Sequence, residues 1–215
     1  MADTHTFSHV PHDAIQFLDK KKFVYIWGSK LPHWFQEHKT TFITFRLADS
    51  LPQTKIEELL YIKRRMQQEG SFSNDAIARE VYNETIISKM DEWIDAGYGG
   101  CILKEPKTRR IVYDAIHYFD GKQYILHSFV IMPNHVHILL TPICDIPILN
   151  YIGEIKRFTA VRINRLLHIE GKIWQKGTFD RLVRDSTEFQ KYWDYIIKNP
   201  RFLSADCYTL YTRDE

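Results

Sequence analysis

The stretch Met132-Pro133-Asn134-His135-Val136-His137-Ile138-Leu139 decides the fold predicted for this chain. It follows the apolar run 124–131. A Pro-Asn pair between two apolar runs is turn chemistry, which predicts two strands joined by a tight connection. Because side chains alternate along a strand, His135 and His137 are expected to lie side by side on one face.

Two imidazoles at this spacing are close enough to hold one cation. The simpler interpretation is a pair of histidines on a solvent-facing edge, because short motifs often occur by chance. Other features of the chain are needed to decide between a cation site and a solvent-facing pair.

Composition places the chain among soluble globular proteins. Its 215 residues, 44% hydrophobic and 14% aromatic, are sufficient for one large domain with a real core. Cys101, Cys144 and Cys207 are widely spaced and form no Cys-x-x-Cys pair, which argues against a disulfide framework or a zinc ribbon. The polar N-terminus and the lack of a long apolar run predict a soluble, cytoplasmic protein.

Charge is unevenly distributed. The net charge is only +2, but residues 151–201 carry eleven Lys or Arg against six acids, a local net charge of +5. A basic C-terminal third suits contact with a polyanion on one face. Solvated helix faces also carry such charge, so this pattern alone is weak.

Hydrophobic periodicity and turn residues predict the other elements. Residues 1–38 read as an N-terminal extension, 39–203 as a single domain with a helical insertion at about 53–118, and 204–215 as a C-terminal tail. We expect the first strand at 40–47, a strand at 179–183, a chain break at 97–100, and helices at 54–68, 73–95, 106–119 and 146–168.

The last predicted helix carries a second candidate site. Asp185 and Glu188 form a plausible N-terminal cap, and Pro200 is expected to end the helix by forcing Asn199 out of helical geometry. Tyr195 falls outside the centre of the apolar stripe, with Asn199 as its i+4 neighbour. The pair is either a surface feature or part of a site.

Both elements together suggest one chemistry. Two histidines and one oxygen ligand leave coordination positions open for water and substrate. A phenolate that attacks phosphorus would form a covalent intermediate. His135, His137, Tyr195 and Asn199 are therefore a candidate set for breaking a phosphodiester, if the last helix packs across the histidine face.

At this point the motifs resemble a known family. Residues 133–137 look like the histidine motif of the HUH single-strand nucleases, and the wider pattern is similar to the REP-associated tyrosine transposases, which are related to the single-tyrosine insertion-sequence transposases. The matching pieces, in order, are Leu31-Pro32-His33-Trp34, Thr44 to Pro52, Phe119-Asp120-Gly121, Val130 to His137, Trp174-Gln175, Phe179-Asp180-Arg181 and Asp194 to Pro200.

The resemblance implies an α+β fold: a ferredoxin-like HUH core with a mostly antiparallel sheet, helices packed on it, and the histidines on a central strand. It implies Mg²⁺ or Mn²⁺ held by His135, His137 and Asn199, with Tyr195 as the nucleophile. The implied reaction is cleavage and rejoining of single-stranded DNA at a hairpin such as a REP-like palindrome, by a monomer or homodimer. Tyr195 would take the 5′-phosphate.

Lys156 and Arg157 are expected to contribute to the affinity for DNA and to its salt dependence, and Trp174 is expected to stack on bases. The candidate DNA-binding residues are Lys156, Arg157, Arg162, Trp174, Gln175, Arg181 and Arg184. One departure affects the prediction of hairpin recognition: the chain reads Pro200-Arg201-Phe202 where members of the family commonly continue with a Val-Arg/Lys-Ala-Gly-Leu type of sequence.

Two alternatives remain. A domesticated relative could bind DNA hairpins without cleaving them, although it would need neither the phenol nor the metal. A zinc-type hydrolase would use water as its nucleophile and would not need Tyr195, but the chain has no His-Glu-x-x-His pattern.

Overall fold

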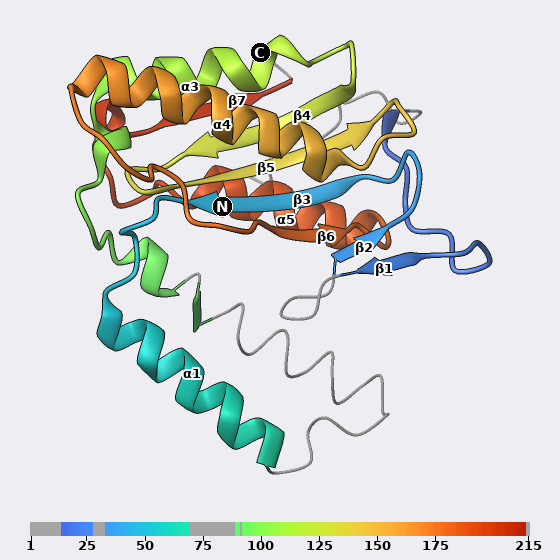
Figure 1. The fold of residues 1–215 in the computed structure, drawn as a ribbon. Helices are drawn as coiled ribbons and strands as arrows, with labels where there is room; N and C mark the ends of the chain where they lie inside the picture. The colour runs from blue at the N-terminus through green and yellow to red at the C-terminus, as the bar shows by residue number, and fades with distance from the viewer. Residues whose placement is uncertain (1–13, 28–32, 69–88, 91, 214–215) are drawn as a thin grey trace, which may run out of the picture.

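The central feature of the computed structural model is a five-stranded antiparallel sheet (Figure 1). The structure describes residues 14–27, 33–68, 89–90 and 92–213. The strand order is β6-β3-β5-β4-β7. The strands are β3 (Thr41–Arg46), β4 (Tyr124–Ile131), β5 (His135–Pro142), β6 (Phe179–Leu182) and β7 (Thr209–Thr212).

The predicted strand–turn–strand around the histidines is confirmed. β4 and β5 pair in antiparallel fashion, with Ile131 opposite Val136 at the turn. β5 lies in the middle of the sheet, between β3 and β4, which confirms the expected central position of the histidines. The register of the β4–β5 pair shifts between Leu126 and Ser128, so His127 occupies a bulge.

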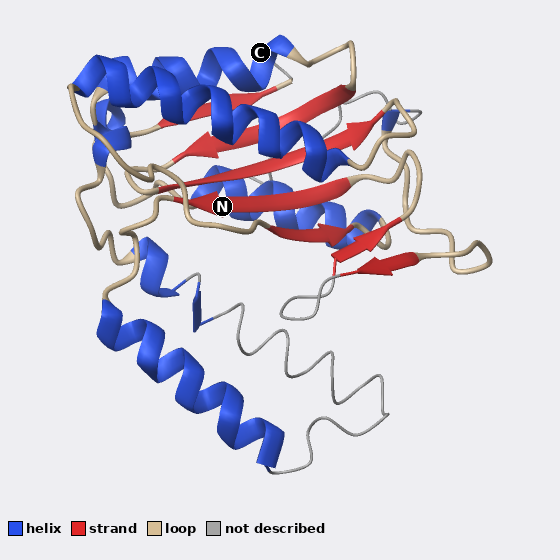
Figure 2. Ribbon diagram, viewed as in Figure 1, coloured by secondary structure: helices blue, strands red, loops and turns tan. Residues whose placement is uncertain are grey.

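Helices cover both faces of the sheet. α3 (Pro106–Tyr118) and α4 (Ile148–Leu167) lie together on one face, and α5 (Ser186–Lys198) lies on the other (Figures 1 and 2). The succession β3-α3-β4-β5-α4-β6, with this strand order, is the split βαβ arrangement of a ferredoxin-like fold. The predicted fold class is therefore confirmed.

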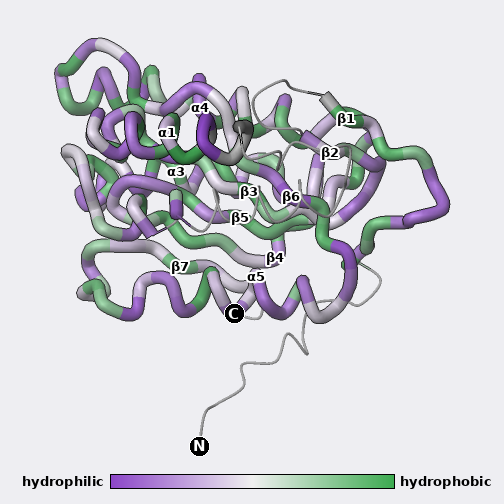
Figure 3. Tube along the Cα trace, turned by 90° about the horizontal axis from the view of Figure 1, so that it is seen from below, coloured by the Kyte–Doolittle hydropathy of each residue, from purple (hydrophilic) through white to green (hydrophobic). Residues whose placement is uncertain are grey.

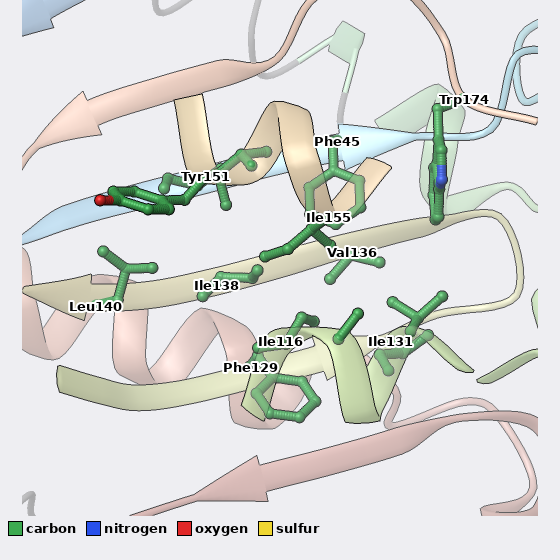
Figure 4. Close-up of a cluster of buried hydrophobic side chains, with 14 of the residues drawn as sticks. Phe45, Ile116, Phe129, Ile131, Val136, Ile138, Leu140, Tyr151, Ile155 and Trp174 are labelled. Atoms are coloured by element: carbon green, nitrogen blue, oxygen red, sulfur yellow. The ribbon is translucent and has the colours of Figure 1, made fainter. Parts of the chain in front are cut away.

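The two faces have separate apolar layers because strand residues alternate. Val136, Ile138 and Leu140 point toward α3 and α4, where they pack with Ile116, Ile155 and Trp174 (Figure 4). Leu139, Phe42 and Val130 point the other way and pack against α5. Hydrophobic residues follow β3, β4 and β5 through the molecule (Figure 3).

The remaining named elements are a helix, two short turns and a hairpin. α1 (Gln53–Gln68) packs through Ile56, Leu59 and Ile62 on a small cluster that contains Trp93. The 3-10 turns are η2 (Ile102–Lys104) and η3 (Ala205–Cys207), and the hairpin consists of β1 (Tyr25–Trp27) and β2 (His33–Phe35). No helix in the described part of the chain is long and apolar enough to cross a membrane.

Three details differ from the predictions. The strand expected first is preceded by the β1–β2 hairpin, and β7, which pairs with β4, was not predicted. Most of the helix expected at 73–95 lies outside the described residues, although 89–90 and 92–95 are helical. α5 ends where expected, but Asn199 keeps helical dihedrals (φ −56°, ψ −45°), so Pro200 ends the helix without displacing its neighbour.

Candidate active site

β5 places both histidines on the face covered by α5. His137 pairs with Thr44, and His135 with Arg46, in the neighbouring strand β3. Both side chains are 1% exposed, so they are not surface histidines. The ring centroids are 4.6 Å apart. This confirms the predicted side-by-side arrangement and excludes the solvent-facing alternative.

Hydrogen bonds orient the two rings. His135 Nδ1 lies 2.7 Å from Asn134 Oδ1, and His137 Nδ1 lies 2.7 Å from Thr44 Oγ1. The amide nitrogen of Asn134 donates to two carbonyls, so its Oδ1 must accept the proton of His135 Nδ1. The Nε2 atom of His135 therefore carries a lone pair, as in a metal ligand.

Burial keeps both imidazoles neutral. Desolvation lowers the pKa of His135 to about 3, and it lowers the pKa of His137 well below its usual range. The positive charge that the other histidine would carry lowers the His137 pKa further. Neutral imidazole is the form that binds metals.

A carboxylate that was not predicted from the sequence completes this group. Asp95 Oδ1 lies 3.4 Å from His135 Nε2, and the ligand atoms of Asp95, His135 and His137 all lie within 4.8 Å of one another. Burial raises the pKa of Asp95 to about 6, against the lowering effect of a hydrogen bond from Asn199.

Asn134 links this carboxylate to the histidines. Its amide nitrogen donates to the carbonyls of Ile94 and Tyr98, both at 3.1 Å. These residues flank Asp95, so one side chain of the turn fixes both the His135 ring and the segment that carries the carboxylate. The glycine-rich break at 97–100 includes two residues with positive φ, Gly97 and Gly99, which turn the chain at this point.

α5 brings the predicted tyrosine to the histidines. Tyr195 Oη lies 3.4 Å from His137 Nε2, and the two rings meet edge to face at 4.9 Å. The ring also contacts Phe42 at 6.0 Å. The hydroxyl therefore faces the histidines from the half-buried edge of the helix, in agreement with the position of Tyr195 outside the apolar stripe.

Asn199 lies one helical turn beyond Tyr195, on the same side. Its Nδ2 is 3.4 Å from Asp95 Oδ1. Its Oδ1 is buried and has no hydrogen-bond partner among the described residues, and the same holds for His135 Nε2. Leaving such an atom unpaired costs about 1–3 kcal/mol.

The side chains present fit a divalent cation. Two buried atoms with free lone pairs, a carboxylate and a second imidazole converge at one place. Imidazole suits transition metals, whereas carboxylate and amide oxygens suit Mg²⁺ and Mn²⁺. His135, His137, Asp95 and Asn199 could therefore hold an ion such as Mn²⁺ or Mg²⁺.

The structure separates several of the predicted DNA-binding residues from this site. Arg157 and Arg162 are exposed on α4, across the sheet from the histidines. The Lys156 ammonium is half-buried and donates to Gln175 O at 3.0 Å, to Thr178 Oγ1 at 3.3 Å and to Gly177 O. Burial and the charge of Arg46 lower the pKa of Lys156 to about 8. Lys156 thus clamps a loop.

Trp174 does not fit its predicted role. It is 7% exposed, donates from Nε1 to Thr159 Oγ1 at 2.8 Å and packs edge to face on Phe45. Its ring faces belong to the core and are not available to a base. This corrects the stacking prediction. The position of Trp174 in a predicted loop did not reveal that its indole packs in the core beneath α4.

The remaining predicted DNA-binding residues lie around β6. Arg181 Nε pairs with Glu188 Oε1 at 3.0 Å, and Glu188 Oε2 also accepts the backbone N–H of Arg184 at 2.8 Å. Gln175 donates its backbone N–H to Arg46 O at 2.9 Å. Their contact with DNA stays a prediction.

A cavity of about 640 Å³ opens beside the histidines. One wall is the segment around Asp95, and the other is the end of α5 with the following turn. Lys198, Arg201 and Phe202 line it together with His135 and Tyr195. None of these three residues was predicted to belong to a site.

Fold and site together define a class: a ferredoxin-like sheet with paired histidines on its central strand, faced by a tyrosine on a closing helix. Residues 102–199, a little under half of the chain, match the family model described as "Transposase IS200 like". This similarity supports the expected relation to insertion-sequence transposases.

Two solved structures are similar. One is described as "Structure of the REP associates tyrosine transposase bound to a REP hairpin"; it is 15% identical, with 81% of this chain and 74% of that chain covered and a TM-score of 0.44. The other, a putative transposase from Deinococcus radiodurans R1, is 14% identical, with 85% and 98% covered and a TM-score of 0.29. No curated protein matches the chain.

Proposed function

We propose that the protein is a metal-dependent single-stranded DNA endonuclease and strand transferase that acts at hairpin DNA. The observation that carries the proposal is the position of Tyr195 Oη, 3.4 Å from His137 Nε2 and beside a cluster of metal-ligand atoms. A purely structural tyrosine at the edge of the helix needs no such neighbours.

In this proposal, His135, His137, Asp95 and Asn199 hold a Mg²⁺ or Mn²⁺ ion. The bound ion supplies Lewis-acid polarisation of a phosphoryl oxygen. Asn134 and Thr44 hold the imidazoles through their Nδ1 atoms, so that Nε2 points into the site.

Tyr195 is the proposed nucleophile. Its oxygen forms a bond to phosphorus, the bond from phosphorus to the 3′-oxygen breaks, and the 5′-phosphate of the downstream strand stays on the protein. The phenol gives up its proton, and the departing 3′-oxygen takes one to become a hydroxyl. Attack of a 3′-hydroxyl on the phosphotyrosine reverses the step and joins strands.

Two alternatives have different requirements. A domesticated hairpin-binding protein needs no phenol beside the histidines, and a hydrolase that uses water needs no Tyr195. The buried His135 Nε2 and Asn199 Oδ1, left without hydrogen bonds among the described residues, favour a site that holds a metal over a simple binding surface.

We further propose a cytoplasmic protein whose partner is a REP-like DNA palindrome.

The test starts from a pool of single-stranded DNA hairpins with randomised flanks, labelled at either end and incubated with Mn²⁺. We expect the 3′-end label to become covalently attached to the protein, and the 5′-end label to leave on a fragment with a free 3′-hydroxyl. Tyr195→Phe should abolish attachment.

Tyr192→Phe is the matched control. Tyr192 lies one turn earlier on the same helix and stacks on Phe42 at 4.3 Å, so its hydroxyl has no role in the proposal. This variant should retain attachment. Cleavage that survives in Tyr195→Phe would indicate water attack, and hairpin binding without cleavage in the parent would indicate the domesticated alternative.

A further inference from the structure

The turn after α5 presents an exposed aromatic ring at the mouth of the candidate site. Phe202 is 85% exposed, more than any other large hydrophobic side chain in the described part of the chain. It lines the same cavity as Tyr195 and His135. A single exposed phenylalanine is common on a protein surface; what distinguishes Phe202 is that it lines the cavity beside the candidate nucleophile Tyr195.

The turn is anchored on both sides of the ring. Arg201 N donates to Lys198 O at 3.2 Å, and Leu203 N donates to Pro200 O at 2.8 Å. Pro200 is buried, and Leu203 packs on the apolar cluster below α5. The backbone is thus fixed where Phe202 points outward, and the ring is presented without a loop having to fold first.

A cation accompanies the ring. The guanidinium carbon of Arg201 lies over Phe202, 4.6 Å from the ring centroid. Lys198, nearby, is paired with Asp194 at 2.7 Å, whereas no carboxylate of the described residues forms an ion pair with Arg201. An aromatic ring with an adjoining guanidinium is the combination that binds single-stranded nucleic acid through a base and a phosphate.

We propose that Phe202 stacks on the base of a nucleotide flanking the phosphate at Tyr195, and that Arg201 contacts a neighbouring phosphate. This rests on the proposed function, since it assigns the strand's path at the same site. It also gives the stacking role predicted for Trp174 to Phe202, in the turn after α5. The ligand is single-stranded DNA, read through stacking and therefore with little dependence on base identity.

The test uses binding without cleavage. The Tyr195→Phe protein is mixed, in EDTA, with a short single-stranded thymidine oligonucleotide that carries one 2-aminopurine. A set of such oligonucleotides places the 2-aminopurine at each position of the strand in turn. We expect quenching of its fluorescence at one position. Phe202→Ala should abolish that quenching and weaken binding roughly 5- to 100-fold, and Phe202→Trp should restore both.

The chain contains a matched control. Phe158 on α4 is 53% exposed and has the Arg162 guanidinium over its ring at 5.7 Å, so it reproduces the same pair across the sheet. Phe158→Ala should leave quenching and affinity unchanged. Arg201→Ala should reduce the slope of binding affinity against salt by about one phosphate contact.

The outcomes separate this inference from the proposed function. Suppose that Phe202→Ala binds and quenches like the parent, while the protein with Tyr195 intact still cleaves hairpins. The proposed stacking by Phe202 is then wrong, and the proposed function stands. Equal losses in Phe158→Ala and Phe202→Ala also overturn it. A parent that binds no single-stranded DNA contradicts both.

Discussion

Asn134 is the residue on which the geometry of the candidate site depends most. Its Oδ1 fixes the His135 ring, and its Nδ2 holds the carbonyls on either side of Asp95. One side chain thereby places ligands from two distant parts of the chain at one point. It is 1% exposed, so water cannot take over these hydrogen bonds.

We predict that Asn134→Ala lowers the affinity for Mn²⁺ by about 10- to 100-fold, as is typical when a residue that orients a metal ligand is lost. Isothermal titration calorimetry measures it. Asn164→Ala is the control, because Asn164 donates a comparable bond, to Gly171 O at 3.0 Å, on α4. An unchanged affinity in a folded Asn134→Ala protein would show that Asn134 does not position the ligands.

At this scale, the predictable residues were those whose spacing defines their direction. His135 and His137 share a strand face, and Tyr195 and Asn199 share a helix side, and both relations are local. Asp95 was missed because its place depends on the path of the chain after residue 95. Trp174 was misassigned because only the packing of α4 decides whether the indole is core or surface.

α5 is the element that joins the tyrosine to the sheet. Its first turn is capped by Asp185 Oδ1, which accepts Glu188 N at 2.8 Å, as predicted. Glu188 in turn accepts from Arg184 N, one residue earlier than in a standard capping box. Phe189, Trp193 and Ile196 are buried against the sheet, so the helix is held by its cap and its apolar face.

We predict that Asp185→Ala lowers the free energy of unfolding by about 1 kcal/mol, the usual cost of losing an N-cap. Urea denaturation followed by circular dichroism measures it. Ser186→Ala, at the next, exposed position, removes no capping bond and should change little. If Asp185→Ala is as stable as the parent, the cap does not contribute to holding α5.

Among the elements, long periodic segments and the strand–turn–strand were predictable from the sequence, since each is specified by its own residues. β7 was not predicted, because the short strand 209–212 is half-buried and gains its hydrogen bonds from β4. The β1–β2 hairpin carried too little periodicity to be distinguished from an extension.

For the whole molecule, buried neutral histidines determine the response to acid. His127, in the β4 bulge, is fully buried, and desolvation with a smaller effect of Arg213 lowers its pKa to about 3. His135 and His137 are shifted the same way. Below pH 6.5 the unfolded chain takes up protons that the folded chain does not. The free energy of unfolding therefore decreases as the pH is lowered. Asp95, with a raised pKa, acts in the opposite direction.

We predict that the protein in EDTA is less stable at pH 5 than at pH 7, with His127 alone contributing roughly 2 kcal/mol. His127→Gln should flatten the dependence of unfolding free energy on pH, measured by urea denaturation at both values. His168→Asn is the control. His168 lies at the exposed end of α4 with φ +54°, a conformation that asparagine adopts readily, so this variant should keep the parent's dependence of unfolding free energy on pH. A parent whose stability does not fall toward pH 5 would contradict the assignment.

The most direct measurement is to locate the nucleotide on the protein. After incubation with Mn²⁺ and the hairpin pool, the protein is digested with trypsin and the DNA trimmed by nuclease. Tandem mass spectrometry then examines the peptide of residues 192–198, which contains both Tyr192 and Tyr195. We predict a nucleotide 5′-phosphate on Tyr195, absent in EDTA. A nucleotide on Tyr192 or on another residue, or cleaved DNA with no protein-linked nucleotide, would contradict the account.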